Sequence, residues 1–187
     1  MSAPLPRRAL GRTGLEVALL GLGTVKLGRR TGMRYPRSFE LPDDASAQRL
    51  LDRARALGMN LLDTAPAYGT SEDRLGRLLA HRRDDFVLVT KCGEIHDGRT
   101  SRFDFGAAHT TASVHASLRR LRTDRLDCVL LHSDGNDEAL VADGAALDAL
   151  ARLKRSGELL SYGISTKTVA GGLAAIPHVD VLMITLA

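Results

Sequence analysis

The sequence predicts an α/β fold in which a parallel sheet is covered by helices. Short apolar, β-branched runs alternate with longer amphipathic stretches, and the runs are apolar on both faces. Because parallel neighbours need a crossover between them, this alternation is typical of repeated strand–helix units. With 187 residues, 44% of them hydrophobic and 26% charged, the chain is long enough to form a core as a single domain over residues 1–187.

Six runs have the length and composition of strands. They cover residues 17–23, 60–64, 86–90, 127–132, 160–165 and 179–186. Five stretches between them repeat apolar residues at spacings of three and four, which predicts helices. These cover residues 45–57, 72–81, 111–121, 145–154 and 169–175. Gly58 is expected as the C-cap of the first helix and Ser71 as the N-cap of the second.

Two parallel architectures fit this order of elements, a doubly wound sheet and a (β/α) barrel. A doubly wound dinucleotide fold usually carries G-x-G-x-x-G after its first strand. The first run here ends in Gly21-Leu22-Gly23-Thr24, with no third glycine at the required offset and no helical pattern. Polar and ionisable residues instead follow the ends of successive strands, where barrel enzymes carry their chemistry. We therefore expect a parallel (β/α) TIM barrel.

The barrel is expected to be truncated. A complete barrel takes about 250 residues and eight strand–helix units, whereas this chain predicts about six strands. Such a sheet leaves two open edges, which favour self-association. The longest irregular stretch, residues 26–44, follows the first strand and is expected to form a loop beside the active site.

Composition argues against several classes of protein. No run approaches the roughly 20 apolar residues of a membrane helix, and the first residues carry no secretory apolar region, so no membrane partner and a cytoplasmic location are expected. Two cysteines, Cys92 and Cys128, do not make a disulfide framework and are expected to be reduced. The net charge is +4, but acidic residues are interspersed and only 4% of residues are aromatic. This pattern argues against nucleic-acid binding.

Four ionisable residues lie at or just beyond predicted strand ends. Asp63 and Tyr68 follow the second strand, Lys91 the third and His132 the fourth. Parallel strand ends of a barrel converge on one mouth, so these side chains are expected to meet. A nearby lysine favours ionisation of a tyrosine, which makes the phenol a better general acid. His132 would orient or polarise an oxygen beside it.

Each of these residues alone has a structural interpretation. Asp63 fits a turn after a strand, Lys91 an ion pair, and His132 a hydrogen-bonded loop. Tyr68 fits an aromatic ring packed over the strand ends. The functional interpretation depends on all four residues following in the order expected for one mouth.

These residues lie in segments that resemble the aldo-keto reductases. LLDTAPAYG at residues 61–69 is similar to the family's first signature, and SLRRLRTDRLDCVLLH at 117–132 to its fourth strand and preceding helix. Residues 8–24 resemble the N-terminal β-hairpin and first barrel strand. VTK at 89–91 and GIST at 163–166 follow in the family's order.

The resemblance implies a reductase of aldehydes or ketones that uses NADPH, with NADH less favoured. The family's catalytic tetrad corresponds to Asp63, Tyr68, Lys91 and His132. By this resemblance Tyr68 protonates the carbonyl oxygen, Lys91 and Asp63 lower its pKa, and His132 orients the carbonyl. The positions expected near the cofactor are Gly23, Thr24, Asp63, Ser165, Thr166 and Met183.

The chain departs from the family at three of its positions. Thr166 stands where asparagine is usual, and Met183 and Leu186 stand where many members have glutamine and tyrosine. One alternative is therefore a non-catalytic binding or regulatory module. Another is a metal-dependent lyase or hydrolase, but no H-x-H or H-E-x-x-H pattern occurs and no metal site is predicted.

The small-molecule carbonyl substrate is not named by the sequence. Residues 26–44 and 93–108 are expected to wall the substrate site. Their arginines suggest that the substrate is an anionic or polyhydroxylated carbonyl compound. The alternative is that these arginines are only solvated side chains of surface loops. These arginines are Arg29, Arg30, Arg34, Arg99 and Arg102.

Overall fold

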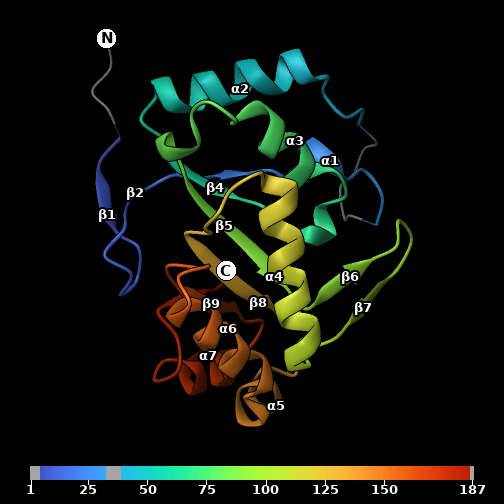
Figure 1. Cartoon of the computed structure of the whole chain (residues 1–187), viewed down its shortest axis with the longest axis vertical. Coiled ribbons are helices and arrows are strands. Elements are labelled where there is room, and N and C mark those ends of the chain that lie inside the picture. Colours follow the sequence, from blue (N-terminus) through green and yellow to red (C-terminus); the bar gives the residue numbers. More distant parts are fainter. Residues whose placement is uncertain (1–4, 33–38, 186–187) are drawn as a thin grey trace.

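Six parallel strands curl into part of a barrel in the computed structural model, which describes residues 5–32 and 39–185 (Figure 1). The strands are β3 (Leu22–Gly23), β4 (Leu61–Asp63), β5 (Val87–Cys92), β8 (Cys128–His132), β9 (Tyr162–Ser165) and β10 (Val181–Met183). They lie in the order β10-β9-β8-β5-β4-β3, and each strand is parallel to its neighbours in the sheet. The predicted parallel (β/α) sheet of six strands, curled as part of a barrel, is confirmed.

All five predicted helices are present, with ends displaced by at most four residues. They are α2 (Asp44–Ala56), α3 (Ser71–Leu78), α4 (Ala107–Leu121), α6 (Ala145–Arg155) and α7 (Val169–Ala175). Two short helices and two 3₁₀ turns were not predicted: the helices α1 (Val25–Gly28) and α5 (Asp137–Asp143), and the turns η1 (Pro66–Tyr68) and η2 (Arg83–Asp85). Their lengths of three to seven residues give too few turns for an apolar period to show.

Both predicted helix caps need correction. Leu57 is the C-cap of α2, and Gly58 follows it in the left-handed conformation, at φ 87°. Thr70 is the N-cap of α3, and Ser71 is its first residue. The Ser71 hydroxyl is 2.8 Å from Oγ1 of Thr24 and donates to the Thr24 carbonyl at 3.0 Å, so it fastens α3 to the end of β3.

Side chains alternate between two faces of the curled sheet. On the outer face, Leu62, Leu88 and Ile164 belong to the large core that packs under the helices. On the inner face, Val89 and Leu130 belong to a smaller cluster that lines the barrel interior. Both cysteines, one on each face, are free and buried, as predicted.

The predicted first strand, residues 17–23, is two elements. Its first part belongs to an antiparallel hairpin of β1 (Arg7–Ala9) and β2 (Glu16–Ala18), and only β3 joins the barrel sheet. Leu19 and Leu20 between them are exposed. An uninterrupted apolar run does not reveal that its two parts pair with different strands, because both parts have the sequence pattern of a strand. The N-terminal hairpin that the family resemblance implied is present.

This hairpin ties together the two sides of the sheet at its N-terminal end. The Asn60 side chain accepts from the Ala18 backbone at 2.8 Å and donates to the Glu16 carbonyl at 2.9 Å. At the other side, the Arg12 guanidinium donates to the carbonyls of Ile176 and Val179 at 2.8 and 2.6 Å. The hairpin therefore links the approach to β4 with the approach to β10.

A second hairpin stands at the opposite end of the strands. Residues 93–108, expected as a loop, contain β6 (Glu94–His96) and β7 (Ser101–Phe103), which project to the right in Figure 1. The other expected loop, residues 26–44, begins in α1. Residues 33–38, including Arg34, lie outside the described residues, as does Leu186.

A buried ion pair fastens α3 to α4. Glu72 is 0% exposed, and its carboxylate lies 2.7 Å from the Arg120 guanidinium and accepts from the Thr90 hydroxyl on β5. The carboxylate thus joins two helices to the sheet. Replacing it leaves a charge and a hydroxyl without their partner.

We expect Glu72→Ala to lower the free energy of unfolding by roughly 2–3 kcal/mol, less than for a fully buried pair because 30% of the Arg120 side chain is exposed. Urea denaturation measures the change. The control is Asp73→Ala, on the same helix but exposed, which should cost less than about 1 kcal/mol. Equal losses in the two variants would contradict this role for Glu72.

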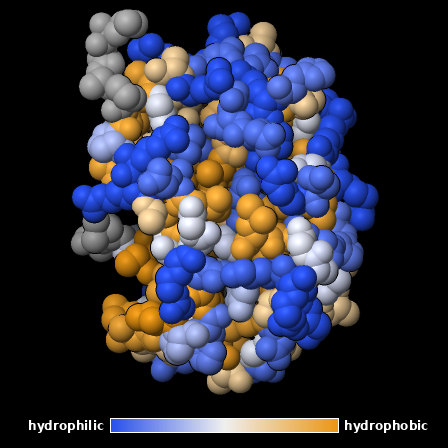
Figure 2. Space-filling model, turned by 60° about the vertical axis from the view of Figure 1, so that its left-hand side comes forward, coloured by the Kyte–Doolittle hydropathy of each residue, from blue (hydrophilic) through white to orange (hydrophobic). Residues whose placement is uncertain are grey.

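The described part of the sheet has two open edges, β3 and β10. Beside β10, α7 exposes Val169 and Leu173, whose exposed fractions are 82% and 63%, and Ile184 is exposed nearby. Figure 2 shows apolar patches among a hydrophilic surface on the face that it presents. No helix in the described ranges is long and apolar enough to cross a membrane. Self-association through the edges stays a prediction.

We expect the 187-residue chain to form dimers that Val169→Glu with Leu173→Glu dissociates, because the added charges disfavour burial of this surface. Sedimentation velocity measures the change. Leu50→Glu on α2, which is exposed away from the edge, should leave the dimer fraction unaltered. A chain that is monomeric throughout its soluble range would refute the expectation.

Candidate active site

The predicted site residues form an inward-facing row at the C-terminal ends of the strands, the mouth of the barrel. Asp63 on β4 pairs with Val89, Lys91 on β5 pairs with Leu130, and His132 on β8 pairs with Ser165. Each site residue therefore lies two positions beyond the one on the preceding strand. This stagger is that of tilted barrel strands, and it brings residues far apart in the sequence to one place.

Lys91 is the centre of the cluster. Its Nζ lies 2.6 Å from Oδ2 of Asp63 and 3.1 Å from the Tyr68 hydroxyl, and it donates to the Thr64 carbonyl at 3.0 Å. The Tyr68 hydroxyl lies 3.4 Å from Oδ1 of Asp63. The ring of His132 stands edge-on to that of Tyr68, with their centres 6.5 Å apart. The four predicted catalytic residues thus lie together.

Two glycines position the turn that carries Tyr68. Gly69 directly follows η1 at φ 63°, a conformation that other residues rarely adopt. A Cβ on Gly69 would lie 2.2 Å from the Gly28 carbonyl oxygen, and one on Gly28 would lie 2.3 Å from the Tyr68 carbonyl oxygen. The absence of side chains lets α1 and the Tyr68 turn meet backbone to backbone.

The expectation that Lys91 and Asp63 lower the pKa of Tyr68 is wrong for this arrangement. Burial of the phenol, and next the charges of Asp63 and Glu94, raise the pKa of Tyr68 above its usual value of 10.0. Burial also lowers the pKa of the Lys91 ammonium group, and the attraction of Asp63 opposes that change. At neutral pH the Tyr68 hydroxyl therefore keeps its proton.

Glu94, the first residue of β6, is a site residue that the sequence did not point to. Its Oε2 lies 2.7 Å from Nδ1 of His132, although this short contact is bent outside hydrogen-bond geometry. Burial alone would raise the Glu94 pKa, but His132, Ser101 and Arg29 hold it at about 2. No motif marks Glu94, because the hairpin that carries it sits in an expected loop.

The positions expected near the cofactor have different environments. Gly23 pairs with Asp63, and Ser165 pairs with Met183, all at the mouth. Thr24 is fully buried, and its hydroxyl donates to the Asp63 carbonyl at 2.8 Å. Thr166 is buried behind the mouth beside α7, and its hydroxyl has no hydrogen-bond partner among the described residues.

The arginines proposed to favour anionic substrates include one that is already engaged. Arg29 donates to the carbonyls of Thr31, Ala67 and Gly32 and lies 3.7 Å from Glu94. Arg30 forms an exposed ion pair with Glu40 at 3.5 Å. These contacts favour a structural role for Arg29.

The sequence pattern of the Aldo/keto reductase family matches residues 19–182. The chain belongs to this family. The match includes all four residues of the tetrad, so the family assignment and the geometry of the mouth concern the same part of the chain. Within the described ranges, no group of three or more His, Cys, Asp or Glu side chains is arranged to hold a metal ion.

Among curated relatives, L-galactose dehydrogenase of Arabidopsis thaliana is 36% identical over 165 residues, which are 84% of this chain and 47% of that protein. Among solved structures, a Pseudomonas aeruginosa protein described as an aldo-keto reductase is similar to this chain, with a TM-score of 0.88 and 53% identity. The match covers 96% of this chain and 68% of that one. The holo form of an aldo-keto reductase from Bacillus halodurans has a TM-score of 0.81 at 30% identity, with coverages of 97% and 58%. The chain spans about half the length of the curated relatives it matches.

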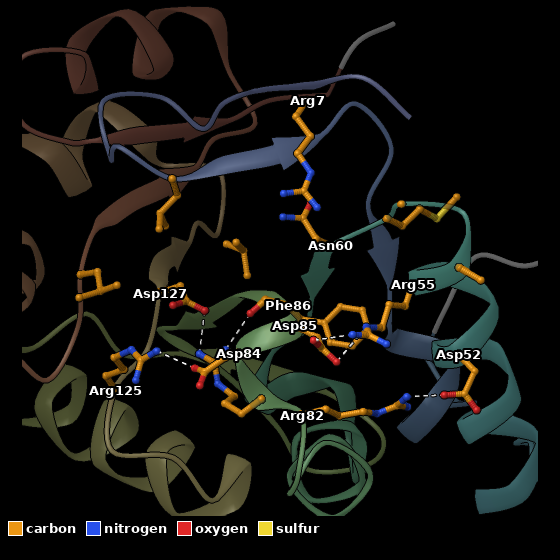
Figure 3. A pocket seen from close by; sticks show the side chains of 17 residues that line it. Arg7, Asp52, Arg55, Asn60, Arg82, Asp84, Asp85, Phe86, Arg125 and Asp127 are labelled. Atoms are coloured by element: carbon orange, nitrogen blue, oxygen red, sulfur yellow. Dashed lines mark hydrogen bonds and ion pairs between the residues drawn. The ribbon is translucent and has the colours of Figure 1, made fainter. Parts of the chain in front are cut away.

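A cavity of about 840 Å³ lies away from this mouth at the N-terminal ends of the strands (Figure 3). Arginines and aspartates alternate around it as ion pairs: Arg55 with Asp85, Arg125 with Asp84, Arg83 with Asp127, and Arg82 with Asp52. Its positive charges are therefore largely compensated, and none of the tetrad lines it.

The Glu94 contacts predict a pH dependence of stability. Its carboxyl is depressed from an ordinary pKa of 4.5 to about 2 in the folded chain, so the unfolded chain binds more protons between these values. The stabilisation is complete above about pH 4.5 and is lost as the pH falls to about 2. We expect the free energy of unfolding to fall between pH 5 and pH 2 by roughly 2–3 kcal/mol more in the parent chain than in Glu94→Gln.

Urea denaturation at several pH values measures this difference. Glu138→Gln, at an exposed position on α5, is the control and should retain the parent slope. Parallel curves for the parent chain and Glu94→Gln would show that Glu94 carries no such linkage.

Proposed function

We propose that this chain carries the catalytic mouth of an NADPH-dependent oxidoreductase that reduces an aldehyde or ketone to an alcohol. The observation that carries the proposal is the meeting of Lys91, Asp63 and Tyr68 within 3.4 Å, with His132 edge-on to the tyrosine. A buried phenol that keeps its proton beside a lysine suits proton donation to an oxygen. Membership of the Aldo/keto reductase family supports the same reaction class.

The residues at the mouth fit the nicotinamide end of such a cofactor. Ser165 lies at the mouth, where it pairs with His132 and Met183, whereas the unpartnered Thr166 hydroxyl is buried behind it beside α7. Met183 and Asp63 line a cavity of about 270 Å³ in the barrel interior. We propose that Ser165 contacts the carboxamide, that Gly23, Thr24 and Asp63 lie beside the ring, and that Met183 packs on it.

The reaction needs a hydride at the carbonyl carbon and a proton at its oxygen. When bound, the reduced nicotinamide supplies the hydride. Tyr68 gives its phenolic proton to the oxygen, and the Lys91 ammonium group, which already donates to the phenol oxygen, stabilises the phenolate that remains. Asp63 balances the buried lysine charge, and His132 holds the carbonyl oxygen in place.

The substrate is proposed to be a small polyhydroxylated carbonyl compound. The name of the Arabidopsis relative, L-galactose dehydrogenase, supports a sugar-like substrate. The mouth residues Asp63, His132 and Ser165 offer hydroxyl-binding oxygen and nitrogen atoms. We also propose a cytoplasmic location, supported by two free and buried cysteines.

Binding is tested by fluorescence titration of NADPH against the 187-residue chain, with NADH as the comparison. Saturable binding with a lower dissociation constant for NADPH supports the proposal, and binding of neither cofactor opposes it for this chain.

We expect Tyr68→Phe to lower kcat for aldehyde reduction by about 100- to 10,000-fold, because it removes the proton donor and keeps the ring. The control is Tyr162→Phe, which loses the same hydroxyl from a tyrosine that packs against the outer core, and it should retain activity. Circular dichroism checks that both variants are folded. Undiminished turnover in Tyr68→Phe would assign the proton to another donor.

A further inference from the structure

The hairpin of β6 and β7 brings Glu94 to His132, and the proposed reaction does not yet use it. Oε2 of Glu94 lies 2.7 Å from Nδ1 of His132, and the two side chains are 11% and 22% exposed. A histidine has only two ring nitrogens, so a carboxylate at Nδ1 decides which of them is left for a substrate. The contact therefore bears on the chemistry of the mouth.

The Glu94 carboxylate is itself fixed by its neighbours. Nη1 of Arg29 lies 3.7 Å from Oε1, and the Ser101 hydroxyl, on the partner strand β7, donates to the same oxygen. The same Arg29 nitrogen donates to the Ala67 carbonyl at 3.1 Å, within the turn that carries Tyr68. Arg29 thus ties the hairpin to the tyrosine turn and compensates the charge of Glu94.

We propose that Glu94 is a positioning residue for His132. The carboxylate holds the proton of the imidazole on Nδ1 and stabilises the doubly protonated ring, which leaves Nε2 to donate to the substrate oxygen. The 2.7 Å separation is within hydrogen-bonding distance, and His132 Nδ1 has no other hydrogen-bond partner among the described residues. The inference deepens the proposed function and rests on it for the role of His132 in turnover.

Other charged and titratable groups face this pair. They are Arg29 after α1, Tyr68 in η1, Lys91 on β5, and His96, His109 and Arg120 around the neighbouring cavity of about 270 Å³. All of them stay in place when only the Glu94 charge is removed. A comparison of the parent chain with Glu94→Gln therefore reports the effect of that one carboxylate on His132.

The experiment is an NMR titration of ¹⁵N-histidine-labelled chain, in which His132→Gln assigns the His132 signals. We expect the ¹⁵N shifts of His132 to lose their preference for protonated Nδ1 in Glu94→Gln, since the carboxylate beside that nitrogen is lost. Glu94→Asp, which keeps the charge, should give His132 ¹⁵N shifts between those of the parent chain and those of Glu94→Gln. It is the control for misfolding of the glutamine variant.

Asp97→Asn is the matched control. Asp97 accepts backbone hydrogen bonds from Arg99 and Thr100 at the tip of the same hairpin, so this variant perturbs the hairpin and leaves the Glu94 contact in place. It should leave the ¹⁵N shifts of His132 unchanged. An unchanged His132 in Glu94→Gln, or an equal shift in Asp97→Asn, would overturn the proposal.

Turnover is measured separately from the titration. In an active chain, Glu94→Gln should lower kcat by about ten-fold, with KM for cofactor unchanged. Altered His132 ¹⁵N shifts in a chain without reductase activity would refute the proposed function and leave the Glu94–His132 pairing standing. An unchanged kcat in an active Glu94→Gln chain would refute the positioning role.

Discussion

The ion pair between Lys91 and Asp63 is the contact on which the mouth depends. A lysine that is 2% exposed is costly without a counter-charge, and Asp63 supplies one at 2.6 Å from the neighbouring strand. The remaining donor capacity of Lys91 is used by the Thr64 carbonyl and the Tyr68 hydroxyl. With β4 and β5 paired in this register, the Tyr68 hydroxyl is the third hydrogen-bond partner of the lysine. The tyrosine therefore completes the hydrogen bonding of the buried charge.

The alternation of apolar runs with amphipathic stretches predicted the sheet order, because each strand and its crossover are local signals. The tetrad followed from the ends of those strands. The split of residues 17–23 and the hairpin that carries Glu94 did not follow, because their partners are set by long-range contacts such as the Asn60 side chain to Ala18 and Glu16. The direction of the change in the Tyr68 pKa was also predicted wrongly. Burial raises this pKa more than a nearby cation lowers it, and a single sequence motif does not show how deeply a side chain is buried.

The two hairpins serve opposite ends of the same strands. The β1–β2 hairpin crosses the N-terminal end and is held by Asn60 on one side and Arg12 on the other. The β6–β7 hairpin stands at the mouth and is held by Arg29 and the contact with His132. The β1–β2 hairpin links the two sides of the sheet, and the β6–β7 hairpin adds the charge of Glu94 to the site. Contacts that stabilise the sheet and residues of the candidate site therefore lie at opposite ends of the strands, as in barrels generally.

Asp63, Lys91 and His132 come from β4, β5 and β8, three adjacent strands in the interior of the sheet, and Tyr68 comes from η1. Their distances are set by the pairing of these strands and by the Tyr68 turn, which packs against α1 after β3, and none of these contacts involves the open edge at β10. The predicted cofactor contacts are different, because Gly23 belongs to one edge strand and Met183 to the other. Loosening the β10 edge would therefore move Met183 before it disturbs the Lys91–Asp63–Tyr68 geometry. The proposed contact of Met183 with a cofactor and the geometry of the proposed proton donor thus depend on different parts of the sheet.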